Sequence, residues 1–349
     1  MKIKSLVVIV IVTFFIIAGC SQSKGSKTIS TPYKQTAFLM GTVVTVKIYD
    51  EGKEAVLEPV FHRIEELARQ ITMNEENEDE SEVTRINKMA GIEPVKVSED
   101  LYKLIESGKQ YSQIADGTFD ISVGPLTSLW HIGYSDAKKP DESEIQEVLS
   151  LIQYEDIELN EDNQTVFLKQ SGMKLDLGAI AKGYITDEVL AVLKENQVET
   201  AIIDLGGNVY VMGKNTSGKD WTIGIQDPFS PRGEIVGRIA ESNISVVTSG
   251  VYERYLEVDG VKYHHILNPK DGYPYSNDIA GVTIISDKSM DGDALSTSVF
   301  SKGIEDGMAF IEEIEDAEAI FISHDKKISM TSGIKKQFEL VNEQFEIVE

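Results

Sequence analysis

The stretch from residue 199 to residue 267 reads as a series of short strands, and this series restricts the possible folds more than any other feature. The strands follow one another through short turns, such as the one at Gly206-Gly207, that leave no room for a crossover helix. Strands joined in this way pair as antiparallel hairpins. The expected strands lie within 199–213, 221–226, 234–239, 244–249, 254–258 and 262–267.

Helical patterns alternate with further strands on both sides of this series. The clearest covers 53–71, where apolar residues recur at helical spacing, and a second is capped by Ser98 and runs through Ala115. This mixture predicts an α+β fold with largely antiparallel sheets and packed helices. Further helices are expected over 83–90, 141–153 and 179–193 and from 291 onward, and further strands over 36–49 (interrupted at 40–42), in a hairpin at 164–177, and over 279–286 and 317–323.

The chain is strongly acidic. Its 349 residues include 58 Asp and Glu against 33 Lys and Arg, a formal net charge of -25. Nucleic-acid binding needs a basic face that neutralises phosphates, so this balance argues against a nucleic-acid partner. It also means that an anionic ligand must meet a local positive charge or a metal ion.

The N-terminus has the layout of an export signal. Lys2 and Lys4 precede an apolar run over 6–17, which small residues and Cys20 follow. The sequence Ile-Ala-Gly-Cys resembles the lipobox of bacterial lipoproteins, which predicts a signal peptide over 1–19 and a lipidated Cys20. The alternative is a plain membrane anchor, for which the apolar run is short.

This reading divides the chain into an anchor, a linker and one domain. Residues 20–32 are rich in Ser, Lys and Thr and are predicted as a flexible tether, and residues 33–349 form the functional domain. Cys20 is the only Cys, so no disulfide forms within the chain. The expected location is the extracytoplasmic face of the bacterial cell membrane, held by the lipid.

Residues 175–184 form the most suggestive local motif. Asp176 ends a short apolar run over 173–177, Gly178 allows a tight turn, and a helix follows that carries Lys182 and Gly183 in its first turn. The N-terminus of a helix presents backbone N–H groups and a positive dipole end to anions. The alternative is an ordinary strand-to-helix connection with a solvated lysine.

Two other segments carry polar groups in unusual settings. Asp120 lies among apolar neighbours in a loop that also contains Gly117 and Gly124, so it is either a structural carboxylate or part of a ligand site. His264 and His265 lie in a strand, whose alternation places them on opposite faces. One of the two can therefore point into a site while the other faces solvent, although a structural histidine is the common alternative.

Asp293 and Thr297 are four residues apart at the start of a helix, and so lie on one face. A carboxylate and a hydroxyl suit a hard cation such as Mg²⁺. The alternative is a capping Asp with a core-facing Thr. The chain has no HExxH zinc pattern, no Walker A or GxGxxG loop and no evident serine elbow.

Taken together and in order, the motifs of this chain resemble those of the ApbE family, the FAD:protein FMN transferases. The resemblance covers nearly all of residues 36–325. It rests on the segments Met40-Gly41-Thr42, Gly117-Thr118-Phe119-Asp120, Leu175-Asp176-Leu177-Gly178, Ala181-Lys182-Gly183-Tyr184, Asp204-Leu205-Gly206-Gly207-Asn208, Ser249-Gly250, His265-Ile266-Leu267-Asn268-Pro269 and Asp293-Ala294-Leu295-Ser296-Thr297.

The resemblance implies a Mg²⁺-dependent enzyme with T-fold-like elements that takes FAD as a substrate. It would transfer FMN to a Thr (or Ser) hydroxyl of an acceptor flavoprotein, such as a subunit of a membrane redox complex, and release AMP. His265 matches the base for the hydroxyl, and the metal would be held by Ala179, Asp293 and Thr297. The FAD contacts would fall on Met40, Gly117, Thr118, Phe119, Asp120, Asp176, Lys182, Ile266 and Leu267.

The chemistry of these residues agrees with such a reaction. A metal ion and Lys182 would supply the positive charge that a diphosphate needs in so acidic a protein. A Thr hydroxyl is a weak nucleophile and needs a positioned base, for which a histidine is suited. Two alternatives stay open: a pyrophosphatase that splits FAD into FMN and AMP at the same site, and a lipoprotein that only binds flavin or another solute.

Overall fold

The structure, a computed structural model, describes residues 27–73 and 80–348. The predicted signal peptide, Cys20, most of the predicted tether and most of the acidic loop after residue 73 lie outside the described residues. The described part contains eight α-helices and seventeen strands, which confirms the predicted α+β class. No helix within that part combines the length and the apolar character needed to cross a bilayer.

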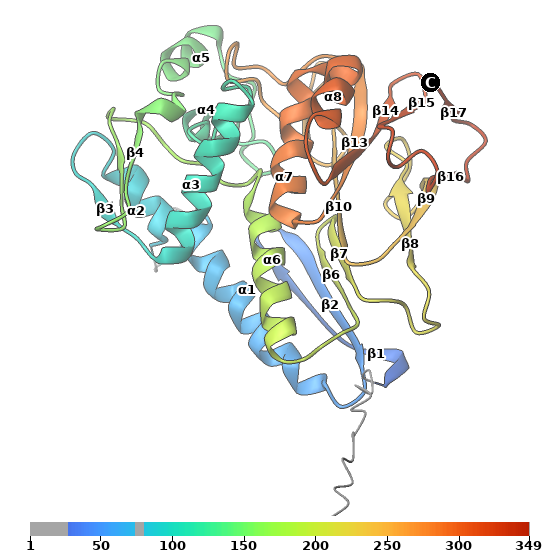
Figure 1. Cartoon of the computed structure of the whole chain (residues 1–349). Helices are drawn as coiled ribbons and strands as arrows, with labels where there is room; N and C mark the ends of the chain where they lie inside the picture. The colour runs from blue at the N-terminus through green and yellow to red at the C-terminus, as the bar shows by residue number, and fades with distance from the viewer. Residues whose placement is uncertain (1–26, 74–79, 349) are drawn as a thin grey trace, which may run out of the picture.

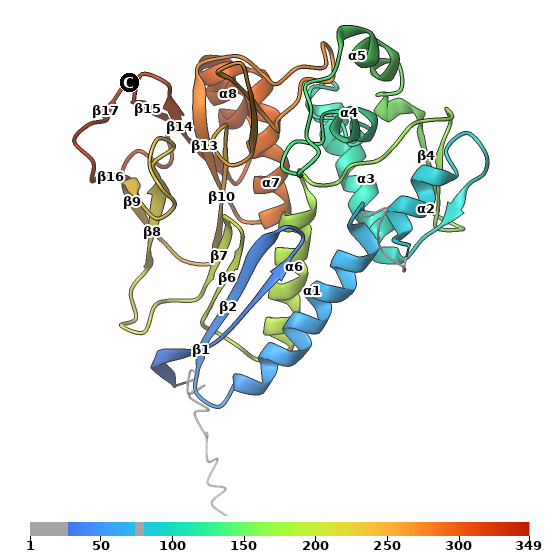
Figure 2. The same cartoon turned by 180° about the vertical axis from the view of Figure 1, so that it is seen from behind.

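A nine-stranded sheet runs through the middle of the molecule (Figures 1 and 2). Its ladders are antiparallel except the last, between β15 and β17, as the hairpin series predicts. In spatial order the strands are β1 (Thr28–Leu39), β2 (Thr42–Asp50), β6 (Ala201–Leu205), β7 (Asn208–Met212), β10 (Ile244–Gly250), β13 (Ile279–Ser286), β14 (Ala317–Ser323), β15 (Lys327–Met330) and β17 (Glu346–Ile347).

The two faces of this sheet carry different cores. Alternation along β7 sends Tyr210 and Met212 to a core with the helices and Val211 to a core with a second sheet. β13 lies between the layers, and all eight of its residues are buried. The helical layer consists of α1 (Leu57–Ile71), α6 (Ala181–Glu195), α7 (Ser289–Ser298) and α8 (Gly303–Glu312), and the second sheet of β8 (Trp221–Gln226), β9 (Ile235–Glu241) and β16 (Glu339–Leu340).

A smaller lobe packs beside the helical layer (Figure 1). The lobe contains α2 (Glu82–Lys88), α3 (Glu99–Ile114), α4 (Gly124–Trp130), α5 (Glu142–Leu149) and the sheet of β3 (Val95–Lys96), β5 (Thr165–Leu168) and β4 (Ile157–Asn160).

A separate hairpin, β11 (Tyr255–Val258) with β12 (Val261–His264), belongs to neither main sheet. The 3-10 turns are η1 (Glu54–Val56), η2 (Tyr154–Asp156) and η3 (Val299–Ser301).

The N-terminal strand prediction was wrong in two ways. Residues 36–49 are not one strand with a bulge, because Met40 and Gly41 have φ angles of 52° and 70° and reverse the chain between β1 and β2. A two-residue turn with both φ angles positive fits the twist of a hairpin, although Met rarely adopts it. β1 also begins at Thr28, which pairs with Asp50, so residues 28–32 are strand and not tether.

The prediction of a strand over 173–177 was also wrong. The predicted hairpin lies earlier, in β4 and β5, and the segment after it forms no ladder. Instead, the side-chain amide of Asn87 donates to the Leu175 carbonyl (3.1 Å) and accepts from the Leu175 N–H (2.7 Å). On one edge of this segment a side chain thus takes the place of a neighbouring strand, whereas on the other edge Lys174 is bridged to Val123.

The helices around this segment begin and end near their predicted bounds, with small shifts. Ser98 accepts a hydrogen bond from the Leu101 N–H, which confirms it as the cap of α3. α5 ends at Leu149 rather than 153, α6 begins at Ala181 rather than 179, and α7 begins at Ser289, two residues before the predicted start.

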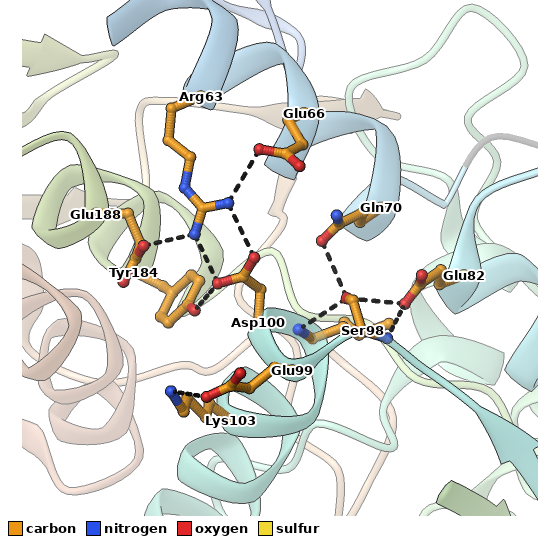
Figure 3. Close-up of polar contacts among 11 residues, drawn as sticks. Arg63, Glu66, Gln70, Glu82, Ser98, Glu99, Asp100, Lys103, Tyr184 and Glu188 are labelled. Carbon is orange, nitrogen blue, oxygen red and sulfur yellow. Dashed lines mark hydrogen bonds and ion pairs between the residues drawn. The ribbon is translucent and has the colours of Figure 1, made fainter. Parts of the chain in front are cut away.

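A half-buried charge network fixes α6 against α1 and α3. Arg63 on α1 forms a two-pronged ion pair with Asp100 on α3, with N–O distances of 2.6 and 2.9 Å, and a third contact of 2.5 Å with Glu188 on α6. Tyr184 on α6 donates to the same Asp100 at 2.9 Å. Figure 3 shows these side chains converging from the three helices, so the first turn of α6 is held in a fixed position.

Candidate active site

The first turn of α6 and the first turns of α7 are joined through one carboxylate. Asp293 on α7 is 2 % exposed, and its Oδ1 accepts from Nζ of Lys182 at 2.9 Å. Its Oδ2 accepts from the backbone N–H of Gly183, also at 2.9 Å. The 175–184 motif and Asp293 are therefore in direct contact.

The bond to Gly183 changes the start of the helix. In a regular helix the N–H of Gly183 would donate to the carbonyl of Ala179, but here it donates to Asp293. In the described part of the chain, neither that carbonyl nor the hydroxyl of Thr297 has a hydrogen-bond partner. The predicted helix N-terminus thus holds a carboxylate of the protein itself.

These three groups suit a hard cation. A carboxylate, a hydroxyl and a backbone carbonyl are oxygen donors of the kind that Mg²⁺ takes, and Mg²⁺ usually keeps several waters or phosphate oxygens besides. Within residues 27–73 and 80–348 no group of three or more His, Cys, Asp or Glu side chains could hold a metal. A site here would therefore depend on the uncommitted carbonyl and hydroxyl.

α7 is positioned by a carboxylate from its neighbour. Asp187 on α6 accepts from the N–H groups of Ser289 and Met290 at 2.9 and 3.0 Å, and so caps the start of α7. Burial raises the pKa of Asp187 to about 6, although both N–H groups act in the opposite direction. The helix that carries Asp293 and Thr297 is thus anchored to the helix that carries Lys182.

His265 follows β12 and faces the carbonyl of Arg254, the residue before β11. The His265 N–H donates to this carbonyl at 3.1 Å, and the ring Nδ1 lies 3.2 Å from the same oxygen. A carbonyl only accepts, so the contact assigns the hydrogen to Nδ1 and leaves the lone pair on Nε2. Desolvation and the charges of Arg254 and Lys182 lower the pKa of His265 to about 3, which keeps the ring neutral.

The neighbouring histidine has a structural role. His264 is buried, its Nε2 contacts the carbonyl of Tyr275 at 2.8 Å, and its Nδ1 accepts from the Ile266 N–H. Burial lowers its pKa as well. The predicted alternation does not hold, because β12 ends at His264 and this histidine is buried against the loop instead of facing solvent. His265 lies beyond the strand, and its Nε2 has no hydrogen-bond partner among the described residues.

Two predicted FAD-binding segments meet at Tyr275. Its hydroxyl donates to the carbonyl of Thr118 at 2.8 Å, and its N–H donates to the carbonyl of Ile266 at 3.1 Å. Leu267 is bridged to Pro274 in the same turn. The segments around residues 118 and 266 are therefore neighbours, although nearly half the chain separates them.

The side chains of the first of these segments face inward. Asp120 is 8 % exposed and accepts from the N–H and hydroxyl of Ser122 at 2.7 and 2.6 Å and from the N–H of Tyr154 at 3.1 Å. Burial raises its pKa. Phe119 is buried against Tyr111, and Gly117 has a positive φ of 69°. The structural reading of Asp120 is favoured, and Phe119 offers a ligand only its backbone.

Asp176 and Met40 complete the predicted set. Asp176 accepts from the Gly178 N–H at 2.8 Å and from the hydroxyl of Thr127 at 2.7 Å, so both of its oxygens have partners. Met40 lies in the β1–β2 turn, and Nη2 of Arg254 comes within 3.8 Å of the Cβ position of Gly41. The turn at Met40 is therefore near His265 through Arg254.

Sequence reasoning missed Arg254, Tyr275 and Asn87 as residues that build this site. The signal for Arg254 was present, because the Asp259-Gly260 turn sets the register of its hairpin. Val258 pairs with Val261, and counting back along both strands places Arg254 opposite His265. Tyr275 and Asn87 act through contacts between distant segments, for which the sequence holds no local signal.

The sequence pattern of this site is shared with known proteins. The model of the ApbE family matches residues 40–321, well over half of the chain. The chain belongs to the ApbE family. The match begins at Met40 and includes every predicted site residue except the lipidation site.

Similar proteins cover nearly the whole ApbE chain. A protein of Klebsiella pneumoniae named FAD:protein FMN transferase is 40% identical over 317 residues, which are 91% of this chain and 97% of the relative. One of the same name from Treponema pallidum is 32% identical and covers 90% of each chain. The crystal structure of an ApbE protein of Thermotoga maritima is 30% identical, with a TM-score of 0.79 over 88% of this chain and 99% of the other.

Proposed function

We propose that this ApbE protein transfers FMN from FAD to the hydroxyl of a Thr or Ser in an acceptor flavoprotein and releases AMP. The observation that carries the proposal is the ring of His265, whose Nδ1 faces the Arg254 carbonyl and whose Nε2 has no partner among the described residues. The charge of Lys182, which is paired with Asp293, helps to lower the pKa of this ring. The names of the relatives from Klebsiella and Treponema support the same reaction.

The reaction balances with the residues at hand. The acceptor Oγ forms a bond to the phosphorus of the FMN half, and the bond from that phosphorus to the bridging oxygen breaks. Nε2 of His265 takes the hydroxyl proton, which then passes to solvent or to the phosphate of the departing AMP. Lys182, whose ammonium lies beside Asp293, would supply positive charge to the diphosphate.

Mg²⁺ is part of the proposal. The Ala179 carbonyl, Asp293 and Thr297 would hold it, and when bound it would neutralise charge on the diphosphate oxygens. The protein's own part is to keep these oxygen donors together, through the Asp187 cap and the Gly183 contact.

The decisive experiment incubates purified protein with FAD, with and without Mg²⁺ and a Thr-bearing acceptor flavoprotein. AMP release and covalent flavin fluorescence on the acceptor are followed. The proposal expects covalent flavin only when enzyme, FAD, Mg²⁺ and acceptor are all present, and none on an acceptor in which that Thr is Val. AMP without covalent flavin would indicate the pyrophosphatase instead, and FAD binding without either product would indicate a binding lipoprotein.

A histidine variant tests the assigned base. His265→Ala is expected to slow transfer far more than it weakens FAD binding, whereas His62→Ala, an exposed histidine on α1, should change neither. A variant of His265 that mainly weakens binding would make it a contact residue and not the base.

We also propose that the protein is anchored by lipid at Cys20 to the outer face of the cytoplasmic membrane. The support is the order of Lys2, Lys4, the apolar run and the single Cys. Cys20→Ala should move the protein from the membrane fraction to the soluble fraction or leave the signal uncleaved. Unchanged fractionation and processing would contradict the anchor.

A further inference from the structure

The guanidinium of Arg254 has no carboxylate partner among the described residues, in a chain that carries an excess of carboxylates. Three arginines of the described part pair with carboxylates, Arg63 with Asp100, Arg232 with Glu253 and Arg238 with Glu339, whereas Arg69 and Arg85, like Arg254, do not. Arg254 is exposed, and yet neither an ion pair nor a side-chain hydrogen bond engages it there. A cation left unpaired in so acidic a protein is available to an anion from outside.

Two glycines direct this side chain. A Cβ on Gly133 would come within 3.2 Å of Cδ of Arg254, so the arginine stem lies against the backbone after α4. The far end then comes near Gly41, where Nη2 is 3.8 Å from the Cβ position. Both glycines have positive φ angles, 99° and 70°, which disfavour any other residue. The Arg254 side chain therefore extends from the β11–β12 hairpin toward the turn at Met40.

The backbone of the same residue holds His265. The Arg254 carbonyl accepts from the His265 N–H and faces Nδ1 of its ring, so both residues occupy paired positions of one hairpin. The charges of Arg254 and Lys182 both act on the His265 ring, which places two cations around the base. Lys182 is committed to Asp293, whereas Arg254 is not.

We propose that the guanidinium of Arg254 binds the diphosphate of the FAD substrate beside His265, so that one hairpin supplies both the base and a phosphate-binding cation. An arginine presents a planar fork of donors that matches two phosphate oxygens at once. Binding there restrains the phosphorus near Nε2 of His265, where the acceptor hydroxyl must lose its proton. The inference rests on the proposed function.

The test compares Arg254→Gln, Arg254→Lys and the control Arg232→Gln with the unaltered full-length protein. Arg232 is a matched control, because it is also exposed and is already paired at 3.2 Å with Glu253, the residue before Arg254. The dissociation constant for FAD is measured by flavin fluorescence in EDTA and again in Mg²⁺. Competition by inorganic pyrophosphate is measured alongside.

We expect Arg254→Gln to raise the dissociation constant of FAD by roughly 10-fold or more, the usual loss for a charge-assisted hydrogen bond. Pyrophosphate should then compete more weakly. Arg254→Lys should recover part of the affinity, and Arg232→Gln should stay within about 2-fold of the unaltered protein. Thermal unfolding should be unchanged, since Arg254 is exposed.

Equal FAD affinity of Arg254→Gln and the unaltered protein would overturn the proposal for Arg254, and so would an equal loss in Arg232→Gln. The covalent transfer assay separates this result from the proposed function. If the unaltered protein transfers FMN and Arg254→Gln has no effect, the proposed function stands and the proposed role of Arg254 is rejected. If FAD affinity depends on Arg254 but no transfer occurs, Arg254 remains a diphosphate contact and the transferase function is rejected.

Discussion

Lys182 and Asp293 lie 111 residues apart in the chain, and Nζ of one is 2.9 Å from Oδ1 of the other. The side chain of Lys182 is 29% exposed and that of Asp293 only 3%, so the carboxylate of this ion pair is almost completely shielded from water. The proposed Mg²⁺ site would share Asp293 with Lys182, so we expect cation binding to weaken this ion pair and to free the ammonium for a diphosphate. The proposed cation and FAD sites would then be coupled.

Removal of the Asp293 carboxylate should cost both activity and stability. Asp293→Ala leaves the Lys182 ammonium and the Gly183 N–H without their acceptor, and loss of one partner of a buried ion pair costs about 3 kcal/mol. Asp293→Asn keeps an oxygen for Gly183 and should lose less. Urea unfolding measures the first effect, and Mg²⁺-dependent AMP release measures the second.

The matched control for this prediction is Thr297→Ala on the same face of α7. Its hydroxyl has no hydrogen-bond partner in the described structure, so its loss should weaken the response to Mg²⁺ without lowering stability. Normal Mg²⁺-dependent turnover in Asp293→Ala would contradict the metal assignment.

Local patterns were enough to predict the elements that carry the site, because each element has its own signal. The apolar spacing of α1, the Ser98 cap and the Gly206-Gly207 turn all act within a few residues. The same is true of the i, i+4 pair Asp293 and Thr297. Periodicity and turn chemistry therefore predict the individual elements.

The arrangement of the site depended on contacts that no local pattern contains. The Asn87 amide replaces a strand beside Leu175, and Met40 adopts a positive φ that its side chain disfavours. The course of Arg254 depends on glycines from two other segments, Gly41 and Gly133. Long-range packing decided each of these, so local sequence patterns could predict the elements but not the contacts between them.

The cap of α7 should be sensitive to Asp187. Asp187→Ala removes the acceptor of two N–H groups at the start of the helix, which costs about 1 kcal/mol. Because α7 carries Asp293 and Thr297, the variant should also need more Mg²⁺ for half-maximal AMP release. Unfolding in urea and a Mg²⁺ titration check the two expectations. An unchanged titration would show that the cap of α7 does not affect Mg²⁺ binding.

The pH dependence of this cap has a definite sign. The folded pKa of Asp187 is raised to about 6, above the unfolded value near 3.8, so its contribution to stability is full below pH 3.8 and declines as the pH rises through 6. Asp187→Asn does not titrate. Its stability relative to the unaltered protein should therefore improve between pH 4 and pH 7.

Arg63 should matter for the fold and not for the chemistry. Arg63→Met leaves Asp100 and Glu188 without their shared cation (Figure 3), and we expect a loss of about 2 kcal/mol at pH 7. Arg69→Met, on the exposed face of the same helix, is the control and should change little. Transfer per folded molecule should stay normal in both variants.

Acid should reduce the difference between Arg63→Met and the unaltered protein. Burial alone would raise the pKa of Asp100, but the hydrogen bonds from Arg63 and Tyr184 outweigh it and lower the pKa. A carboxylate with a lowered pKa stabilises the fold above its unfolded pKa and loses this contribution as the pH falls through the folded value. The stability gap should therefore be constant near neutral pH and narrow below about pH 4. A gap that persisted there would assign the loss to packing of the arginine stem.

The lowered pKa of His265 should be visible in the pH dependence of the reaction. Its pKa in the free protein is lowered to about 3 by burial and by the charges of Arg254 and Lys182, so the ring is already neutral throughout the physiological range. The acid limb of kcat/KM reports groups of the free enzyme and should therefore lie well below pH 6.5, the usual value for histidine. A limb near 6.5 would show that the ring is solvated in the working enzyme.

The same shift predicts the stability of the protein in acid. A histidine whose folded pKa is lowered binds a proton in the unfolded chain first, so the fold loses stability as the pH drops below 6.5. His265→Gln removes this proton uptake. The unaltered protein should therefore lose more stability than His265→Gln between pH 7 and pH 5, measured by urea unfolding at both values. Parallel losses would mean that the ring is protonated equally easily in both states, and the base would then need another source of its neutrality.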